Sequence, residues 1–220
     1  MTTPTAFVFD LDGVIANTPE YHYQAWKRLA DEEGIPFTRE DNDRLRGTDR
    51  RQGVLLVLKG RELTPDEMDT WMKRKSDYFQ VYLANISPKD LMPGVGDFLH
   101  EAKARGMKLG LASSSRTAKE VITNLGIRDI LDAVGDAYSV SNPKPAPDLF
   151  LWVAGRLNAP PAQTVVFEDA EAGVDAALKA SMFVVGLGPA SRVGKAHVVL
   201  PDLGGVHVDD VLRALPLSAR

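Results

Sequence analysis

Short apolar runs that alternate with helical patterns are the feature of this chain that most restricts its fold. The first run, Ala6-Phe7-Val8-Phe9, has the continuous apolar character of a strand that is buried on both faces. Five similar runs follow, at residues 107–112, 133–135, 164–167, 183–187 and 198–200. Stretches with helical spacing lie between them, near residues 94–105, 117–125, 147–157 and 171–180. This order predicts an α/β fold with a doubly wound, mainly parallel sheet and helices on both faces.

The segment from about Pro19 to Ser87 has a different pattern. It contains no clear strand, and apolar residues recur at helical spacing in its first part, at Tyr21, Ala25, Trp26 and Leu29. Further along, Thr64-Pro65-Asp66-Glu67 is a capping box with proline at the first helical position. We expect the helix that begins there to run to about Ile86.

This helical segment predicts a second domain inserted into the first. We expect a core domain at residues 1–16 and 90–220, and an α-helical cap domain at residues 17–89. The two connections, near residues 15–19 and 87–93, would act as a hinge. A cleft between two such domains is a common place for a substrate site.

The composition excludes several kinds of protein. The chain has no cysteine, so it forms no disulfide or thiolate zinc site and has no cysteine nucleophile. A formal net charge of −4 offers no general attraction to nucleic acid, and no apolar stretch is long enough to span a bilayer. Residues 1–5 lack the features of a signal peptide. We therefore expect a cytoplasmic monomer that binds neither nucleic acid nor membrane.

Paired carboxylates follow two of the apolar runs. Asp10 and Asp12 come directly after the first run, at positions of a strand that point to the same side. Glu168 and Asp169 follow the run at residues 164–167. Solvated aspartates at a strand end, and carboxylates at a helix N-terminus, are the ordinary alternatives. Acidic side chains that converge from several strand ends indicate a hard divalent cation such as Mg²⁺.

Two further polar stretches follow apolar runs. Ser113-Ser114-Ser115-Arg116-Thr117 combines hydroxyls with the start of a helix, a combination that suits a phosphate or, alternatively, an ordinary helix N-cap. Lys144 lies between Pro143 and Pro145 in a stiff loop. A lone lysine is usually solvated at the surface, but one held in this way could balance a phosphate and an aspartate.

These four stretches resemble, in order and spacing, the four motifs of the haloacid dehalogenase superfamily, over nearly the whole chain. The resemblance implies a Rossmann-like core with an inserted helical cap. It also implies that Asp10 is a nucleophile that becomes phosphorylated, that Asp12 is a general acid and base, and that Ser113 and Lys144 belong to the catalytic set. Mg²⁺ would be the cofactor, with Asp10, Asp12, Glu168 and Asp169 as the metal-binding residues.

Stretches in the helical segment resemble the cap signatures of the β-phosphoglucomutase family, namely residues 20–26 and 46–50. By this resemblance, Arg50, Ser115, Arg116 and Thr117 would hold the phosphate that is not transferred. Sugar contacts would come from Trp26, Gly47 and Lys75, and Ser114 would be a further substrate-binding residue. Thr18 and His22 would couple the position of Asp12 to cap closure. Thr117 stands where that family commonly has asparagine, and Gly53 stands where it often has serine.

The cap residues also have ordinary interpretations. Trp26 can be a core residue, or a core residue and a sugar platform at once. His22 can be a histidine on a helix surface, Arg50 a solvated charge, and Lys75 part of the exposed basic run at residues 73–75.

The expected substrate is a small phosphorylated sugar, and the expected reaction interconverts β-D-glucose 1-phosphate and glucose 6-phosphate through glucose 1,6-bisphosphate. A hexose-phosphate phosphatase that shares the first step is the alternative, because motifs do not decide whether water or a sugar accepts the phosphoryl group. A phospho-aspartate receiver module is a third hypothesis. Receivers are about half as long as this chain and lack a helical insertion.

Overall fold

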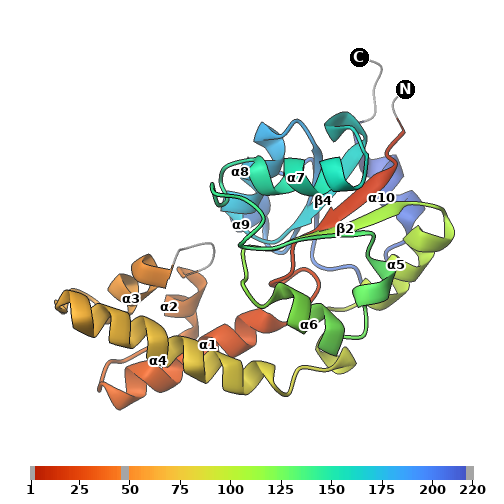
Figure 1. Ribbon diagram of the computed structural model, residues 1–220. Coiled ribbons are helices and arrows are strands. Elements are labelled where there is room, and N and C mark those ends of the chain that lie inside the picture. The colour runs from red at the N-terminus through yellow and green to blue at the C-terminus, as the bar shows by residue number, and fades with distance from the viewer. Residues whose placement is uncertain (1–2, 46–49, 217–220) are drawn as a thin grey trace. The chain divides into compact units, whose positions relative to one another are not determined.

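The computed structural model describes residues 3–45 and 50–216, and within them six strands form one parallel sheet (Figure 1). The strands are β1 (Ala6–Phe9), β2 (Lys108–Ala112), β3 (Ala133–Gly135), β4 (Thr164–Glu168), β5 (Phe183–Leu187) and β6 (Val198–Leu200). They lie side by side in the order β3-β2-β1-β4-β5-β6. All these strand pairs are parallel, which confirms the predicted doubly wound α/β core.

Strand β1 lies at the centre of the sheet. Val8 pairs with Gly110 of β2 on one side and with Val166 of β4 on the other. The chain builds one half of the sheet with β2 and β3 and the other half with β4, β5 and β6, so the strand order reverses between β1 and β4. The carboxyl ends of strands at such a reversal are where open α/β sheets bind their ligands.

One face of the sheet is filled by phenylalanine rings. Phe7 stacks on Phe98 of α5 (Val95–Ala104) with ring centroids 5.7 Å apart, and Phe9 stacks on Phe167 at 4.6 Å. These side chains are fully buried. Aromatic rings of this size contribute a large share of the apolar area that a core buries.

The opposite face receives the other side chains of β1. Ala6 and Val8 belong to an apolar cluster that includes residues of α7 (Asp148–Arg156), α8 (Glu171–Lys179) and Val193 of α9 (Ala190–Val193). Figure 1 shows α7 and α8 on the opposite side of the sheet from α5. The other helices that follow β2 or flank the sheet strands in sequence are α6 (Ala118–Asn124) and α10 (Val208–Ala214). Short 3-10 turns are η1 (Pro88–Asp90), η2 (Arg128–Ile130) and η3 (Pro161–Gln163).

Contacts divide the chain into two compact units, one made of Met1–Asn17 with Ser87–Arg220 and the other of Thr18–Ile86. The second unit is helical in its described part, with α1 (Thr18–Glu32), α2 (Arg39–Asp43), α3 (Arg50–Leu58) and α4 (Pro65–Leu83). Its core residues are Trp26, Leu29, Ala30, Phe37, Val54, Val57, Leu58, Met68 and Trp71. In the described part of the chain, no helix is long and apolar enough to cross a membrane.

Helix α4 begins as the sequence predicts. The Glu67 carboxylate accepts a hydrogen bond from the Thr64 backbone N–H at 2.7 Å, which completes the capping box. The helix ends at Leu83, three residues before the expected Ile86. Asn85 donates its side-chain amide to the Val81 carbonyl and so caps the last turn, and Ser87 precedes a proline, which disfavours helical geometry.

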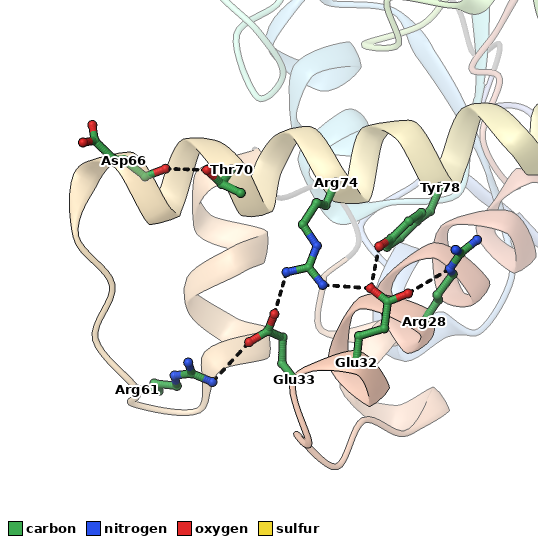
Figure 2. Close-up of polar contacts among 8 residues, drawn as sticks. All are labelled: Arg28, Glu32, Glu33, Arg61, Asp66, Thr70, Arg74 and Tyr78. Atoms are coloured by element: carbon green, nitrogen blue, oxygen red, sulfur yellow. Dashed lines mark hydrogen bonds and ion pairs between the residues drawn. The ribbon is translucent and has the colours of Figure 1, made fainter.

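Charged residues join α1 to α4 along one side of this unit (Figure 2). The Arg74 guanidinium donates to Glu33 at 2.5 Å and to Glu32 at 2.8 Å, and Tyr78 donates its hydroxyl to Glu32. Arg28 reaches the same Glu32 carboxylate from one turn earlier on α1. Hydrogen bonds from Tyr78, Arg74 and Arg28 hold the pKa of the Glu32 carboxyl at about 2.

Candidate active site

Buried polar residues gather at the carboxyl ends of the central strands. Asp10 follows β1, and its backbone N–H donates to Phe167 of β4 at 2.9 Å, so strand pairing continues up to this residue. Ser113 follows β2, and Glu168 and Asp169 lie at the end of β4. All four are buried. The parallel sheet therefore brings together residues more than 150 positions apart in sequence, as the motifs predict.

Lys144 is buried and lies between two of these carboxylates. Its Nζ donates to Asp10 Oδ1 at 2.6 Å, to Glu168 Oε2 at 2.8 Å and to the Ala112 carbonyl at 3.0 Å. Burial alone would lower the pKa of Lys144, but the carboxylates of Asp10 and Glu168 outweigh that effect and raise it. The ammonium is charged and fully hydrogen-bonded, so the solvated-lysine alternative does not describe this residue.

Three carboxylates converge beside this lysine. Oxygen atoms of Asp10, Glu168 and Asp169 all lie within 4.8 Å of one another. Burial raises the pKa of the Glu168 carboxyl, the Asp10 carboxylate adds to the rise, and Lys144 opposes it. The donor set is made of hard oxygen atoms with more negative charge than Lys144 can balance, which fits a divalent cation such as Mg²⁺.

Asp12 is placed differently from the three converging carboxylates. Its side chain is half-buried and is not in that group, although the sequence predicts it as a metal ligand. Its backbone N–H donates to Asp10 Oδ2 at 2.9 Å, so the main chain of Asp12 contacts the Asp10 carboxylate. Gly13 turns the chain at a φ of 83°, a conformation that favours glycine.

The Glu168 side chain is held by the turn that follows it. Its Oε1 accepts hydrogen bonds from the backbone N–H groups of Asp169 and Ala170, both at 3.1 Å. A Cβ on Gly173 would come within 1.9 Å of Glu168 Oε2. The glycine in the first turn of α8 therefore makes room for this carboxylate. Sequence reasoning missed this glycine.

The stretch from Ser113 to Thr117 forms a connected hydroxyl loop. Ser113 Oγ accepts from the Ser115 N–H at 3.0 Å, and Ser115 Oγ lies 3.0 Å from Thr117 Oγ1. Thr117 is the N-cap of α6 but makes no side-chain cap hydrogen bond. Arg116 lies 5.7 Å from the centre of the Tyr138 ring. Ser114 is exposed and lines a cavity of about 200 Å³ with Asp136, Ala137, Val140, Ser141, Pro143 and Leu149.

Within the helical unit, three predicted residues lie together. Lys75 Nζ is 2.6 Å from His22 Nδ1 and 5.2 Å from the centre of the Trp26 ring. Phe79, which sequence reasoning missed, stacks on the His22 ring at 4.0 Å and lies 4.6 Å from the Lys75 ammonium. The signal that could have found it is its position four residues after Lys75, on the same helix face.

The residues predicted in this unit differ in burial. Trp26 is buried in the helical core, as its ordinary interpretation has it. Thr18 is buried at the start of α1, and Arg50 is exposed at the start of α3. Gly47 lies outside the described residues.

The chain is similar to known proteins in sequence and in fold. A family model for haloacid dehalogenase-like hydrolases matches residues 4–181. A protein of Bacillus subtilis (strain 168) named Beta-phosphoglucomutase is 41% identical over 199 residues, which is 89% of this chain and 88% of that protein.

Two further relatives resemble nearly the whole chain. A Phosphorylated carbohydrates phosphatase of Thermotoga maritima is 30% identical over 96% of this chain and 97% of its own length. The crystal structure of β-phosphoglucomutase from Clostridium difficile superposes with a TM-score of 0.86 at 34% identity, over 96% of this chain and 97% of the other.

Proposed function

This chain belongs to the haloacid dehalogenase-like hydrolases, and from that premise we propose that it is a β-phosphoglucomutase. It interconverts β-D-glucose 1-phosphate and glucose 6-phosphate through a phosphorylated Asp10 and a glucose 1,6-bisphosphate intermediate. The buried contact of Lys144 with Asp10 and Glu168 carries this proposal, because it holds a buried carboxylate nucleophile beside a fixed positive charge. The likeness to the Bacillus subtilis protein supports the choice of sugar.

The chemistry begins at Asp10. Its carboxylate attacks one phosphorus of the bound bisphosphate, the bond from that phosphorus to the sugar oxygen breaks, and Asp12 donates a proton to that oxygen, which releases a sugar monophosphate. In the second half, Asp12 removes a proton from the accepting sugar hydroxyl. That oxygen attacks the phosphorus, and the acyl phosphate on Asp10 is cleaved.

The pocket supplies positioning and charge, which are the main requirements of phosphoryl transfer. Lys144 offsets the charge of Asp10 and of the transferred group, and Ser113 holds that group. Asp10, Glu168 and Asp169, together with Asp12, would hold Mg²⁺, which when bound neutralises negative charge on the phosphoryl group. We assign the second phosphate to Arg50, Ser115, Arg116 and Thr117. We assign the sugar to Trp26, Gly47 and Lys75, and Ser114 to substrate binding. We assign the control of Asp12 to Thr18 and His22.

A sugar-phosphate phosphatase is the second candidate. The phosphatase relative from Thermotoga maritima covers nearly the same length of chain and supports it. The two activities share the first half-reaction and differ in the acceptor, which is a sugar hydroxyl in the mutase and water in the phosphatase. Exclusion of water from the site favours the sugar.

One assay separates the two candidates. The enzyme receives β-glucose 1-phosphate, Mg²⁺ and a trace of glucose 1,6-bisphosphate, and glucose 6-phosphate and free phosphate are measured together. A mutase yields mainly glucose 6-phosphate. Mainly free phosphate would reject the mutase and favour the phosphatase.

The role of Arg50 provides a second comparison. Arg50→Ala should impair the bisphosphate-dependent isomerisation far more than the hydrolysis of a small aryl phosphate, which has no second phosphate to hold. Arg51→Ala is the matched control, because it removes the same charge from the next exposed position of α3. Equal losses of both activities in Arg50→Ala would contradict a contact with the second phosphate.

A further inference from the structure

Arg192 contacts Asp169, one of the three converging carboxylate residues. It belongs to α9, which follows β5, and β5 pairs with the strand that carries Glu168. Its Nε donates to the Asp169 main-chain carbonyl at 2.5 Å, and its Nη2 lies 3.7 Å from Asp169 Oδ2. One guanidinium therefore contacts both the backbone and the carboxylate of this residue. Neither the motifs nor the resemblance assigned Arg192 a role.

The turn before α9 leaves space for this guanidinium. Gly188 has a φ of 122°, which L side chains rarely adopt, and a Cβ placed there would lie 2.4 Å from Arg192 Nη2. A side chain at position 188 would compete with the guanidinium for the same volume. The approach of Arg192 to Asp169 therefore depends on a second residue of the same turn.

The peptide groups around Asp169 are held from two directions. Glu168 Oε1 accepts from the N–H groups of Asp169 and Ala170, while Arg192 donates to the carbonyl between them. The backbone of Asp169 is thereby fixed at both of its peptide groups. The carboxylate of Asp169 is contacted by the same guanidinium, through Arg192 Nη2.

We propose that Arg192 is a positioning residue, which orients the Asp169 carboxylate for a divalent cation held by Asp10, Glu168 and Asp169. This inference rests on the proposed metal-dependent function. A hydrogen-bonding partner behind a metal ligand restricts its orientation, and loss of such a partner typically weakens metal binding about 10- to 100-fold.

The direction of the effect distinguishes positioning from charge. If the guanidinium acted only as a positive charge beside the site, its removal would strengthen binding of a cation. If it orients Asp169, its removal weakens binding. The two explanations therefore predict changes of opposite sign for the same variant.

The test is Mg²⁺ titration by calorimetry of the full-length wild type, Arg192→Met, Arg192→Lys and Arg213→Met, with folding followed by circular dichroism. Arg192→Met keeps the aliphatic stem and removes the donors, and we expect its dissociation constant to rise about 10- to 100-fold. Arg192→Lys keeps the positive charge but lacks the planar guanidinium, so its Mg²⁺ affinity should lie between those of Arg192→Met and the wild type. Arg213→Met removes an exposed arginine paired with Asp210 and should bind as the wild type does.

Activity gives an independent readout. The Mg²⁺ concentration for half-maximal rate should rise in Arg192→Met while kcat at saturating Mg²⁺ changes little, a split that general destabilisation does not produce. Equal or tighter Mg²⁺ binding by Arg192→Met would overturn this inference alone. No Mg²⁺ binding by the wild type would overturn it together with the proposed metal dependence. If Arg192→Met does not fold, Arg192→Lys decides, and binding equal to that of the wild type would overturn the inference.

Discussion

The ammonium of Lys144 lies 2.6 Å from Oδ1 of Asp10, although 134 residues separate them in sequence. Glu168 accepts from the same ammonium at 2.8 Å. An ion pair at this depth is costly to form and still more costly to leave half-made, because the charges have lost most of their water. The buried carboxylates of Asp10 and Glu168 therefore need the positive charge of Lys144 beside them. A bound phosphate and a cation would add further charges to this pocket.

Lys144→Met should destabilise the fold strongly when Mg²⁺ is absent. The variant leaves Asp10 and Glu168 buried without their shared partner, and breaking a buried pair in this way costs about 3–5 kcal/mol. Urea unfolding in EDTA and in Mg²⁺ measures the loss, and Mg²⁺ should restore part of it. Lys103→Met, which breaks a half-exposed pair with Asp132, should cost at most about 1 kcal/mol. Equal losses in the two variants would contradict this account.

Asp10→Asn should abolish turnover and leave the protein folded. The amide keeps the shape of the side chain but is not a nucleophile, so we expect the rate to fall by a factor on the order of 10³ or more. Acid-quenched intact-mass measurement should detect a phosphorylated wild type and no such species in the variant. Asp129→Asn makes the same change at an exposed position and serves as the control. Substantial turnover by Asp10→Asn would disprove the nucleophile assignment.

Gly173→Ala should destabilise the protein even though alanine is the better helix former. The new Cβ would come within 1.9 Å of Glu168 Oε2, so the buried carboxylate must move, at a cost of about 1–3 kcal/mol. Mg²⁺ binding should weaken with it.

Gly155→Ala is the matched control for that change. It lies in α7 with no atom within 4 Å of the added Cβ, so it should stabilise the protein by about 0.4–1 kcal/mol. Thermal unfolding of both variants checks the pair, and similar changes in both would show that the Glu168 contact is unimportant.

Glu32→Gln should reduce stability at neutral pH and lose this effect in acid. Tyr78, Arg74 and Arg28 hold the pKa of Glu32 at about 2 in the folded state, below its ordinary 4.5. Its contribution is therefore present above about pH 4.5 and disappears as the pH falls toward about 2, where the wild-type carboxylate is protonated. Urea midpoints of both proteins across this range should converge at low pH. A constant difference would refute the network in Figure 2 as its source. Glu40→Gln, which alters an exposed pair with Arg44, is the control.

Local pattern was enough to predict the regular elements of this protein. The six apolar runs became β1 to β6 almost residue for residue, because short apolar runs separated by helical stretches are typical of a parallel sheet covered by helices. The capping box at Thr64 began α4 for an equally local reason, since its hydrogen bonds span three residues. The motifs at the strand ends predicted that Asp10, Ser113 and Glu168 lie at one edge of the sheet, because the carboxyl ends of parallel strands lie at the same edge.

The contacts between distant residues were decided by the tertiary structure alone. The Lys144 ammonium lies between Asp10 and Glu168, Asp12 is outside the converging carboxylates, and Arg192 contacts Asp169. These three relationships depend on strand order and loop geometry. Sequence spacing determines how a residue sits in its own strand or helix, because the backbone repeats are short. It does not determine which atoms of different loops come into contact, since that follows from how the sheet and its helices pack together.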